Sequence, residues 1–143
     1  MTDDIKNLFS DYMRLPTFRL IELTNVDQEG NFGDRPIQVA ASRGRTDEIE
    51  TLLNHGADID SCGEHGFTAL HLAATMGRSE AIRLLLSRGA NPLKKNDDGD
   101  TPLAIAIASQ HDENIPSDWN DIVGILQQAT STAIQAASLE RHL

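Results

Sequence analysis

The sequence contains little that would place it among secreted, disulfide-bonded or membrane-spanning proteins. Its 143 residues include a single cysteine, Cys62, which excludes an internal disulfide framework and favours a reducing compartment. No apolar run approaches the length of about 18 residues that marks a transmembrane helix. The first residues, MTDDIKNLFSDYM, lack the basic start and apolar centre of a secretory signal. We therefore expect a cytoplasmic protein that does not contact a membrane.

Motifs for catalysis and ligand binding are also scarce. Cys62 and His65 form one C-x-x-H pair, but a zinc site needs three or four convergent ligands and no second pair of suitable spacing is present. The chain has no glycine-rich phosphate loop, no nucleophile elbow and no H-E-x-x-H motif. His111, Asp112 and Glu113 cluster, and a polar surface loop explains them better than a catalytic site. We expect no enzymatic activity, no cofactor and no metal.

Basic residues are few in comparison with acidic ones. Twelve Lys and Arg stand against 22 Asp and Glu, for a net charge of −10. Residues 1–32, 33–65 and 99–143 carry −3, −4 and −5, whereas residues 66–98 carry +2. Such a field repels phosphate backbones, which argues against a nucleic-acid partner, and would steer a basic protein toward the acidic ends. The alternative is that excess acid only keeps a small domain soluble.

The chain does contain a repeat at a fixed interval. Gly33, Gly66 and Gly99 each open a related segment, and each lies 33 residues from the next. In the second copy, GFTALHLAATMGRSEAIRLLLSRGAN, a threonine precedes a short apolar run, and a glycine separates that run from a second apolar stripe. Each unit is therefore predicted to be helix, turn, helix and an extended connection. Because two short helices cannot bury their apolar faces alone, the units must stack.

The two best copies resemble the ankyrin repeat, whose pattern has a G-x-T-P-L-H opening, a pair of small residues, two leucines and a closing glycine-alanine. The positions that match between the copies are Gly44 with Gly77, Ile49 with Ile82, Leu52-Leu53 with Leu85-Leu86, and Gly56-Ala57 with Gly89-Ala90. The resemblance is to a small, stand-alone, bacterial-type member. It implies an all-α, ankyrin-like α-solenoid of about three helix-turn-helix repeats, with short hairpin fingers and N- and C-terminal capping helices.

We expect a single domain over residues 1–143. Its parts are 1–32, an N-terminal cap and half-repeat; 33–65, repeat 1; 66–98, repeat 2; 99–128, repeat 3 with an insertion at about 110–117; and 129–143, a C-terminal helix. Pro16 interrupts the first part, and residues 18–23 are predicted to be the second helix of the opening half-repeat. The C-terminal helix is either a separate cap or an extension of the preceding helix. In ankyrin-like openings, the histidine at position 71 hydrogen-bonds between neighbouring repeats, and alanine takes its place at 104.

The resemblance also implies a binding surface made of the fingers and the first helix of each repeat. Mapped onto this chain, the candidate partner-binding residues are Phe32, Asp34, Arg43, Glu64, His65, Phe67, Thr75, Met76, Lys95, Asp97, Asp98, Asp100 and Trp119. Phe32, Phe67 and Met76 would form an apolar centre with an acidic rim. The alternative is that the two phenylalanines are half-buried packing. Trp119 is interpreted as packing of the insertion, with a partner contact as the other interpretation.

We expect a non-enzymatic module that binds another protein through its concave face and fingers. The acidic charge suggests a basic partner, such as a toxin or effector, that the chain would neutralise as an immunity protein. The alternative is a structural adaptor that bridges two protein partners. We expect the free chain to be a monomer.

Overall fold

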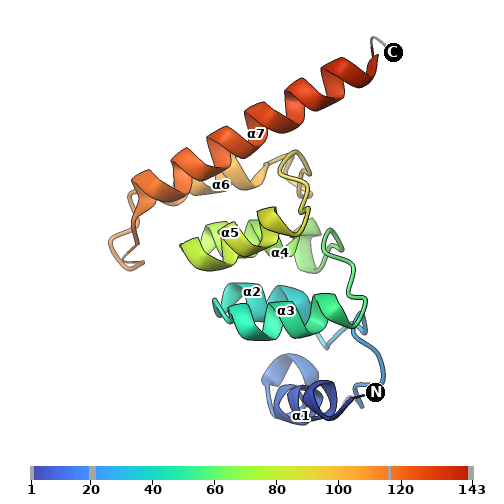
Figure 1. The fold of residues 1–143 in the computed structure, drawn as a ribbon. Coiled ribbons are helices and arrows are strands. Elements are labelled where there is room, and N and C mark those ends of the chain that lie inside the picture. The colour runs from blue at the N-terminus through green and yellow to red at the C-terminus, as the bar shows by residue number, and fades with distance from the viewer. Residues whose placement is uncertain (1, 20–21, 116, 142–143) are drawn as a thin grey trace.

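The computed structural model describes residues 2–19, 22–115 and 117–141 of the chain. Within these ranges it contains helices and no strand, and the helices lie in layers along one axis (Figure 1). The elements in chain order are α1 (Asp3–Tyr12), η1 (Pro16–Phe18), α2 (Pro36–Ser42), α3 (Thr46–Asn54), η2 (Glu64–Gly66), α4 (Ala69–Thr75), α5 (Ser79–Ser87), α6 (Pro102–Ser109) and α7 (Trp119–Arg141). The all-α stack predicted from the repeat is confirmed.

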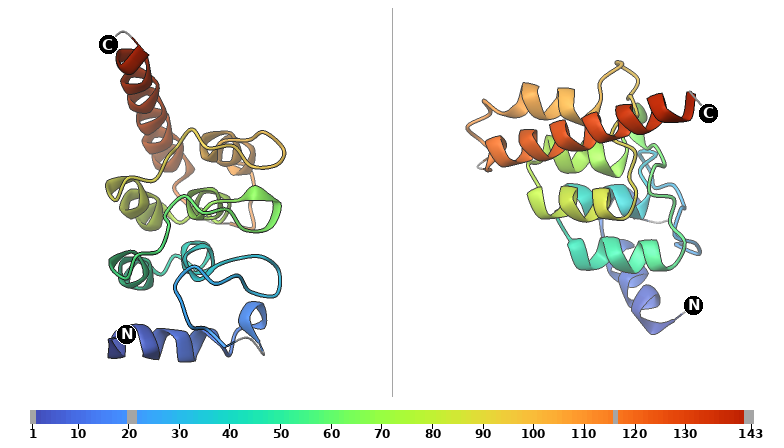
Figure 2. Two further views of the ribbon diagram at one scale, coloured as in Figure 1. Left: turned by 90° about the vertical axis from the view of Figure 1, so that its right-hand side faces the viewer. Right: turned by 45° about the horizontal axis from the view of Figure 1, so that its top comes forward.

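Two rows of helices run along the axis of the stack. α2, α4 and α6 form an inner row, in which each helix packs on the next, and α1, α3, α5 and α7 form an outer row (Figure 2, left). Each helix-turn-helix unit contributes one helix to each row. The 33-residue period of the sequence is therefore the step from one layer to the next.

Apolar residues at equivalent positions bury the faces between layers. In α3, α5 and α7 of the outer row, the large side chains that are fully buried are Ile49, Leu52, Ile82, Leu85, Ile122 and Leu126. In the inner row the buried side chains include many small ones, among them Ala40, Ala41, Ala73, Ala74 and Ala106. Small side chains let neighbouring inner helices pack closely on one another. The result is one continuous core along the stack.

The N-terminal segment differs from the expected arrangement. The sequence predicted a helix over residues 18–23, of which residues 20–21 lie outside the described part, and residues 22–24 are not helical. α1 instead takes the outer-row place against α3. The short η1 turn that follows it puts the ring of Phe18 against that of Tyr12, with centroids 5.8 Å apart and both side chains fully buried. Pro16 opens this turn, since its fixed φ suits a first helical position.

The expected insertion connects α6 to α7. Ser117 ties it to the second repeat, because its Oγ donates a hydrogen bond to the carbonyl oxygen of Gly77 at 2.9 Å. Gly77 has a φ of 65°, and a Cβ at this position would collide with the Ser117 hydroxyl. Glycine therefore serves both the turn between α4 and α5 and the close approach of the insertion.

Helix α7 is continuous for 23 residues. Of the two arrangements considered for the C-terminus, the structure shows the extension, since the second helix of repeat 3 runs on without a break to Arg141. The start of α7 packs against α5 and α6, and its C-terminal half lies beyond α6 (Figure 1; Figure 2, right).

Candidate protein-binding surface

Three finger-like loops of the same geometry project beside the inner row. We define finger 1 as residues 30–34, finger 2 as 63–67 and finger 3 as 96–100. In each finger, the first N–H donates to the fifth carbonyl oxygen, with N–O distances of 2.8, 2.9 and 2.9 Å. The fourth residue is Gly33, Gly66 or Gly99, with φ of 88°, 74° and 84°. The three glycines that reveal the repeat are thus the residues that allow each finger to turn.

Hydrogen bonds join neighbouring fingers into a row. The Asp34 carboxylate of finger 1 accepts from the Glu64 N–H of finger 2 at 3.0 Å, and the His65 carbonyl oxygen accepts from the Asp97 N–H of finger 3 at 3.0 Å. Burial raises the pKa of Asp34, although the bond from Glu64 N–H opposes this change. A Cβ at Gly63 would collide with the Asp34 carboxylate, so glycine is needed where the fingers meet.

Hydrogen bonds from buried polar side chains connect neighbouring repeats beneath the fingers. His71 accepts from the Thr68 N–H at Nδ1 (3.2 Å) and lies 2.8 Å from the Asp100 carbonyl oxygen at Nε2. The ring must therefore carry its proton on Nε2 and be neutral, and burial lowers its pKa accordingly. The inter-repeat bond predicted for His71 is confirmed. This ring has no free nitrogen for a metal or a proton transfer.

Gln38 makes the equivalent hydrogen bonds one repeat earlier. It lies 33 residues before His71 and is also fully buried. Its Oε1 accepts from the Arg35 N–H at 2.7 Å, and its Nε2 donates to the Ser61 carbonyl oxygen at 2.7 Å. Sequence reasoning missed Gln38, although the repeat spacing aligns it with the histidine. Ala104, at the third equivalent position, has no side chain that could form such a bond.

The predicted binding residues of the fingers differ in how far their side chains are exposed to solvent. Phe32 is 58% exposed, and the other exposed side chains of the fingers are Glu64, His65, Asp97 and Asp98, with Lys95 exposed just before finger 3. Asp34 and Asp100 are half-buried. Phe67 is half-buried too, and its ring stacks on His71 with centroids 5.7 Å apart. Phe67 thus packs within its own repeat, whereas Phe32 projects into solvent.

The remaining predicted residues lie at the opposite ends of the inner helices. Arg43 follows α2, where it pairs with Glu48 at 3.7 Å and lies over the Tyr12 ring, 5.9 Å from its centroid. Thr75 ends α4 and donates from its hydroxyl to the His71 carbonyl oxygen, and Met76 beyond it is 36% exposed. An inner helix of seven residues is about 10 Å long. The structure therefore does not bring Phe32 and Met76 into one apolar centre.

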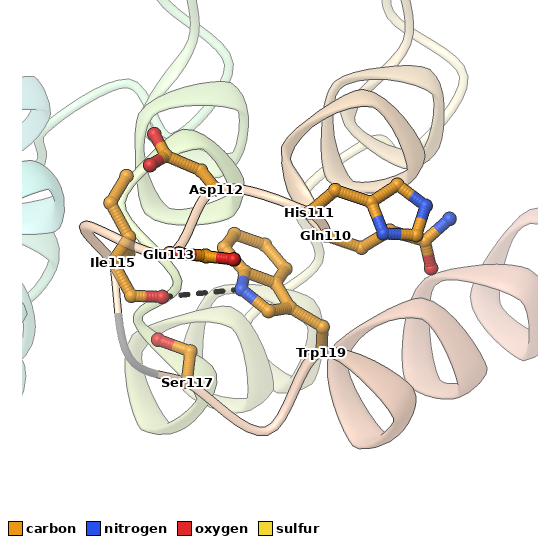
Figure 3. A pocket seen from close by; sticks show the side chains of 7 residues that line it. All are labelled: Gln110, His111, Asp112, Glu113, Ile115, Ser117 and Trp119. Carbon is orange, nitrogen blue, oxygen red and sulfur yellow. Dashed lines mark hydrogen bonds between the residues drawn. The ribbon is translucent and has the colours of Figure 1, made fainter.

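Trp119 lies at this far end as well, in the first turn of α7. It is nearly fully buried, and its Nε1–H donates to the Ile115 carbonyl oxygen at 3.3 Å (Figure 3). The indole borders an open depression of about 380 Å³ beside the insertion. Figure 3 shows His111 and Asp112 on this rim with their side chains pointing apart, so they do not form an acid–base pair.

Residues 2–19, 22–115 and 117–141 contain neither a metal-binding cluster nor a membrane-spanning helix. No group of three or more His, Cys, Asp or Glu residues in these ranges is placed to hold a metal ion. None of the helices described combines the length and the apolar character that crossing a bilayer requires.

Comparison with known proteins agrees with the geometry of the stack. A search among curated proteins returned no match to the chain. A family model described as ankyrin repeats (3 copies) matches residues 14–96. The match begins in the opening half-repeat and ends in finger 3, so α6 and α7 lie outside it. Repeats of this family generally mediate protein–protein interactions. The chain belongs to the ankyrin-repeat family, because the family model covers more than half of its length and the helix pairs stack at the same period.

Proposed function

We propose that this protein is a non-enzymatic cytoplasmic binding module that holds a partner protein against the fingers. The observation that carries the proposal is the exposed ring of Phe32 in finger 1. A hydrogen bond from the Glu64 N–H to the Asp34 carboxylate connects this finger to finger 2. Aromatic side chains are frequent anchors of interfaces, and a solubility role gains nothing from exposing one. A hydrogen-bonded row also loses little conformational entropy when a partner binds.

The charge around this anchor favours a basic partner. Glu64, Asp97 and Asp98 are exposed in the fingers, and Lys95, just before finger 3, is an exposed lysine beside them. Acidic side chains at the rim would steer a basic surface into contact and add specificity more than affinity. In its sharper form, the proposal is that the chain neutralises a basic toxin or effector, as an immunity protein does, by covering the partner's active surface.

A structural adaptor that bridges two partners is the second candidate. It requires another binding face, and the C-terminal half of α7, which lies beyond α6, offers one. Under this alternative two different proteins would bind the chain at once, one at the fingers and one at α7.

The test is co-purification with mass spectrometry, followed by titration calorimetry with the partner recovered. We expect a basic protein whose affinity falls about tenfold or more for Phe32→Asp, since the change removes an anchor and places charge at the contact. Met13→Asp is the matched control, because Met13 is also an exposed apolar residue but lies at the end of α1, outside the fingers. Recovery of acidic proteins alone, or equal affinities for the parent chain and a folded Phe32→Asp variant, would contradict the proposal.

A further inference from the structure

The three fingers share one backbone geometry but differ in the chemistry of their tips. The tip of a finger is formed by its second and third residues, which are Asn31 and Phe32 in finger 1, Glu64 and His65 in finger 2, and Asp97 and Asp98 in finger 3. With histidine taken as neutral, the tips carry charges of 0, −1 and −2. The three loops lie one above another beside the inner row (Figure 2, left), so the negative charge increases along one side of the stack.

Finger 1 presents an apolar side chain to the solvent. Phe32 is 58% exposed. The side-chain amide of Asn31 is engaged within the chain, since it donates to the carbonyl oxygens of Pro16 and Arg19 at 3.2 and 2.9 Å. Asp34, the acid of this finger, is half-buried and accepts the hydrogen bond from finger 2. The ring of Phe32 is therefore the main group that finger 1 offers to a partner.

Finger 2 carries an acid with a basic side chain beside it. The Nε2 atom of His65 lies 3.4 Å from the Oε1 atom of Glu64, and both side chains are exposed. Glu64 therefore has a polar neighbour within its own finger. The Glu64 N–H and the His65 carbonyl oxygen connect this finger to fingers 1 and 3, at 3.0 Å in both cases. Finger 2 thus fixes the spacing between the other two.

Finger 3 carries two acids without a basic partner. Asp97 and Asp98 are both exposed, and none of the ion pairs among residues 2–19, 22–115 and 117–141 includes either carboxylate. The backbone of Asp97 is held by its N–H bond to the His65 carbonyl oxygen. The backbone of Asp98 is held by its N–H bond to Asn96 Oδ1 at 3.0 Å. A partner that covers these carboxylates removes their water, so it must supply cations in return.

The apolar and the acidic end of the row lie at a set distance from each other. Packed helices are about 8–10 Å apart, so finger 3, two layers from finger 1, lies about 20 Å away from it. The layers are in direct contact, because α2 packs on α4 and α4 packs on α6. The hydrogen bonds between the fingers oppose changes in this distance. The row therefore offers two different contacts at one spacing.

We propose that the finger row recognises a partner surface that carries an apolar group and, about 20 Å from it, a pair of cationic side chains. The apolar group packs on Phe32, and the cations pair with Asp97 and Asp98. This inference rests on the proposed function and adds to it the direction in which the partner lies along the fingers. In the reverse direction the apolar group would cover two carboxylates, and the cations would find no acid at the tip of finger 1.

The test uses rigid peptide rulers and NMR titration of the full chain. The first ruler has a tryptophan and two arginines separated by six prolines, with both of its termini blocked. A polyproline helix rises about 3.1 Å per residue, so six prolines span about 19 Å. The second ruler has only two prolines, which span about 6 Å. The third has six prolines and carries two aspartates in place of the arginines.

We expect the long arginine ruler to bind at least about tenfold more tightly than the other two, because it alone reaches both ends of the row at once. The amide signals of Phe32, Asp97 and Asp98 should shift together during its titration. Phe32→Ser, and Asp97→Asn combined with Asp98→Asn, should each reduce its affinity to that of the short ruler. Asp3→Asn combined with Asp4→Asn is the matched control for net charge and should leave its affinity unchanged at physiological salt.

Circular dichroism establishes that the variants keep their helices. Equal affinities for the long and short arginine rulers, equal affinities for the arginine and aspartate rulers, or no binding of the long arginine ruler would overturn the inference. The natural partner tests the proposed function separately. A basic partner that loses affinity for Phe32→Asp, but not for the variant with asparagine at Asp97 and Asp98, would contradict this inference alone. Binding of the long ruler without recovery of any basic partner would bear on the proposed function alone.

Discussion

At the scale of single residues, two different side chains form the same link between repeats. Gln38 and His71 each accept from a backbone N–H at the start of their own helix and each lie against a carbonyl oxygen of the next connection. A glutamine amide and a neutral imidazole both offer one acceptor and one donor on opposite sides. A protonated imidazole offers no acceptor, which makes the second link sensitive to pH.

We expect His71→Gln to remove a pH dependence of stability. Burial lowers the pKa of His71 below its usual 6.5, so the folded chain favours the neutral ring. The stability from this neutral ring is complete above the unfolded pKa. It falls as pH drops through about 6.5, because the unfolded chain binds the proton first. Urea unfolding at about pH 7.5 and about pH 5.5 should show a smaller loss for His71→Gln than for the parent chain.

The repeat provides a reciprocal control for this experiment. Gln38→His places an imidazole in the equivalent buried position and should add a loss of stability at low pH. Comparing variants of one chain cancels the effect of the acidic groups, among them Asp34, whose raised pKa acts in the opposite direction. Equal pH profiles for the parent chain and His71→Gln would show that the pKa of this ring is the same in the folded and the unfolded chain.

At the scale of elements, the insertion is held in place by packing and by two specific hydrogen bonds. Ser117 donates to the Gly77 carbonyl oxygen, and Trp119 donates to that of Ile115. The buried indole fills the space where the insertion meets α7. This geometry supports the packing interpretation of Trp119, and its position away from the fingers separates it from the proposed binding surface.

Replacing Trp119 should therefore change stability and not partner affinity. Trp119→Phe keeps most of the buried ring but loses the bond to Ile115, for an expected cost of about 1 kcal/mol. Trp119→Ala should cost about 3–5 kcal/mol, because it leaves a cavity. Urea unfolding measures both effects, and calorimetry with the partner measures affinity. A folded Trp119→Phe variant that binds the partner much more weakly would instead place Trp119 in the interface.

At the scale of the whole molecule, acidic and uncharged regions occupy different parts of the stack. The finger tips carry exposed acids, whereas α6 and most of α7 carry no charge. Screening by salt should therefore weaken the attraction of a basic partner to the fingers.

Removing acid from the fingers should slow association with a basic partner. Asp97→Asn combined with Asp98→Asn lowers the steering field at finger 3, so the association rate should fall severalfold at low salt and depend less on ionic strength. Asp3→Asn combined with Asp4→Asn is the matched control, with the same change in net charge at the start of α1. Stopped-flow measurements compare the association rates of the two double variants with that of the parent chain. Equal rates would show that net charge, and not the position of the fingers, steers the partner.

Much of the architecture could be predicted from local residue chemistry. Gly33, Gly66 and Gly99 mark turns that only glycine adopts easily, and the leucine and isoleucine positions mark the buried side of each helix. The binding surface was harder to predict. Phe32 and Phe67 look alike in the sequence, but one projects into solvent and the other stacks on His71. That difference depends on the neighbouring layer, which no local pattern encodes.

The structure of the first and last layers could not be predicted from the local pattern either. Residues 18–23 have helical spacing, yet α1 is the helix that takes the outer-row place against α3. The exposure of Ile107 could not be predicted from the repeat either, since the equivalent residues of the earlier layers, Ala41 and Ala74, are buried.

The sequence by itself determined the repeat, the helix pairs and the stacking, because turn geometry and the burial of apolar faces follow from residues within one period. Tertiary structure alone decided which side chains are exposed and which are packed: Phe32 and Ile107 are exposed, whereas Trp119 is buried. The physical reason is that a residue's exposure depends on whether another layer lies against it, and equivalent positions in a repeat do not all have such a neighbour.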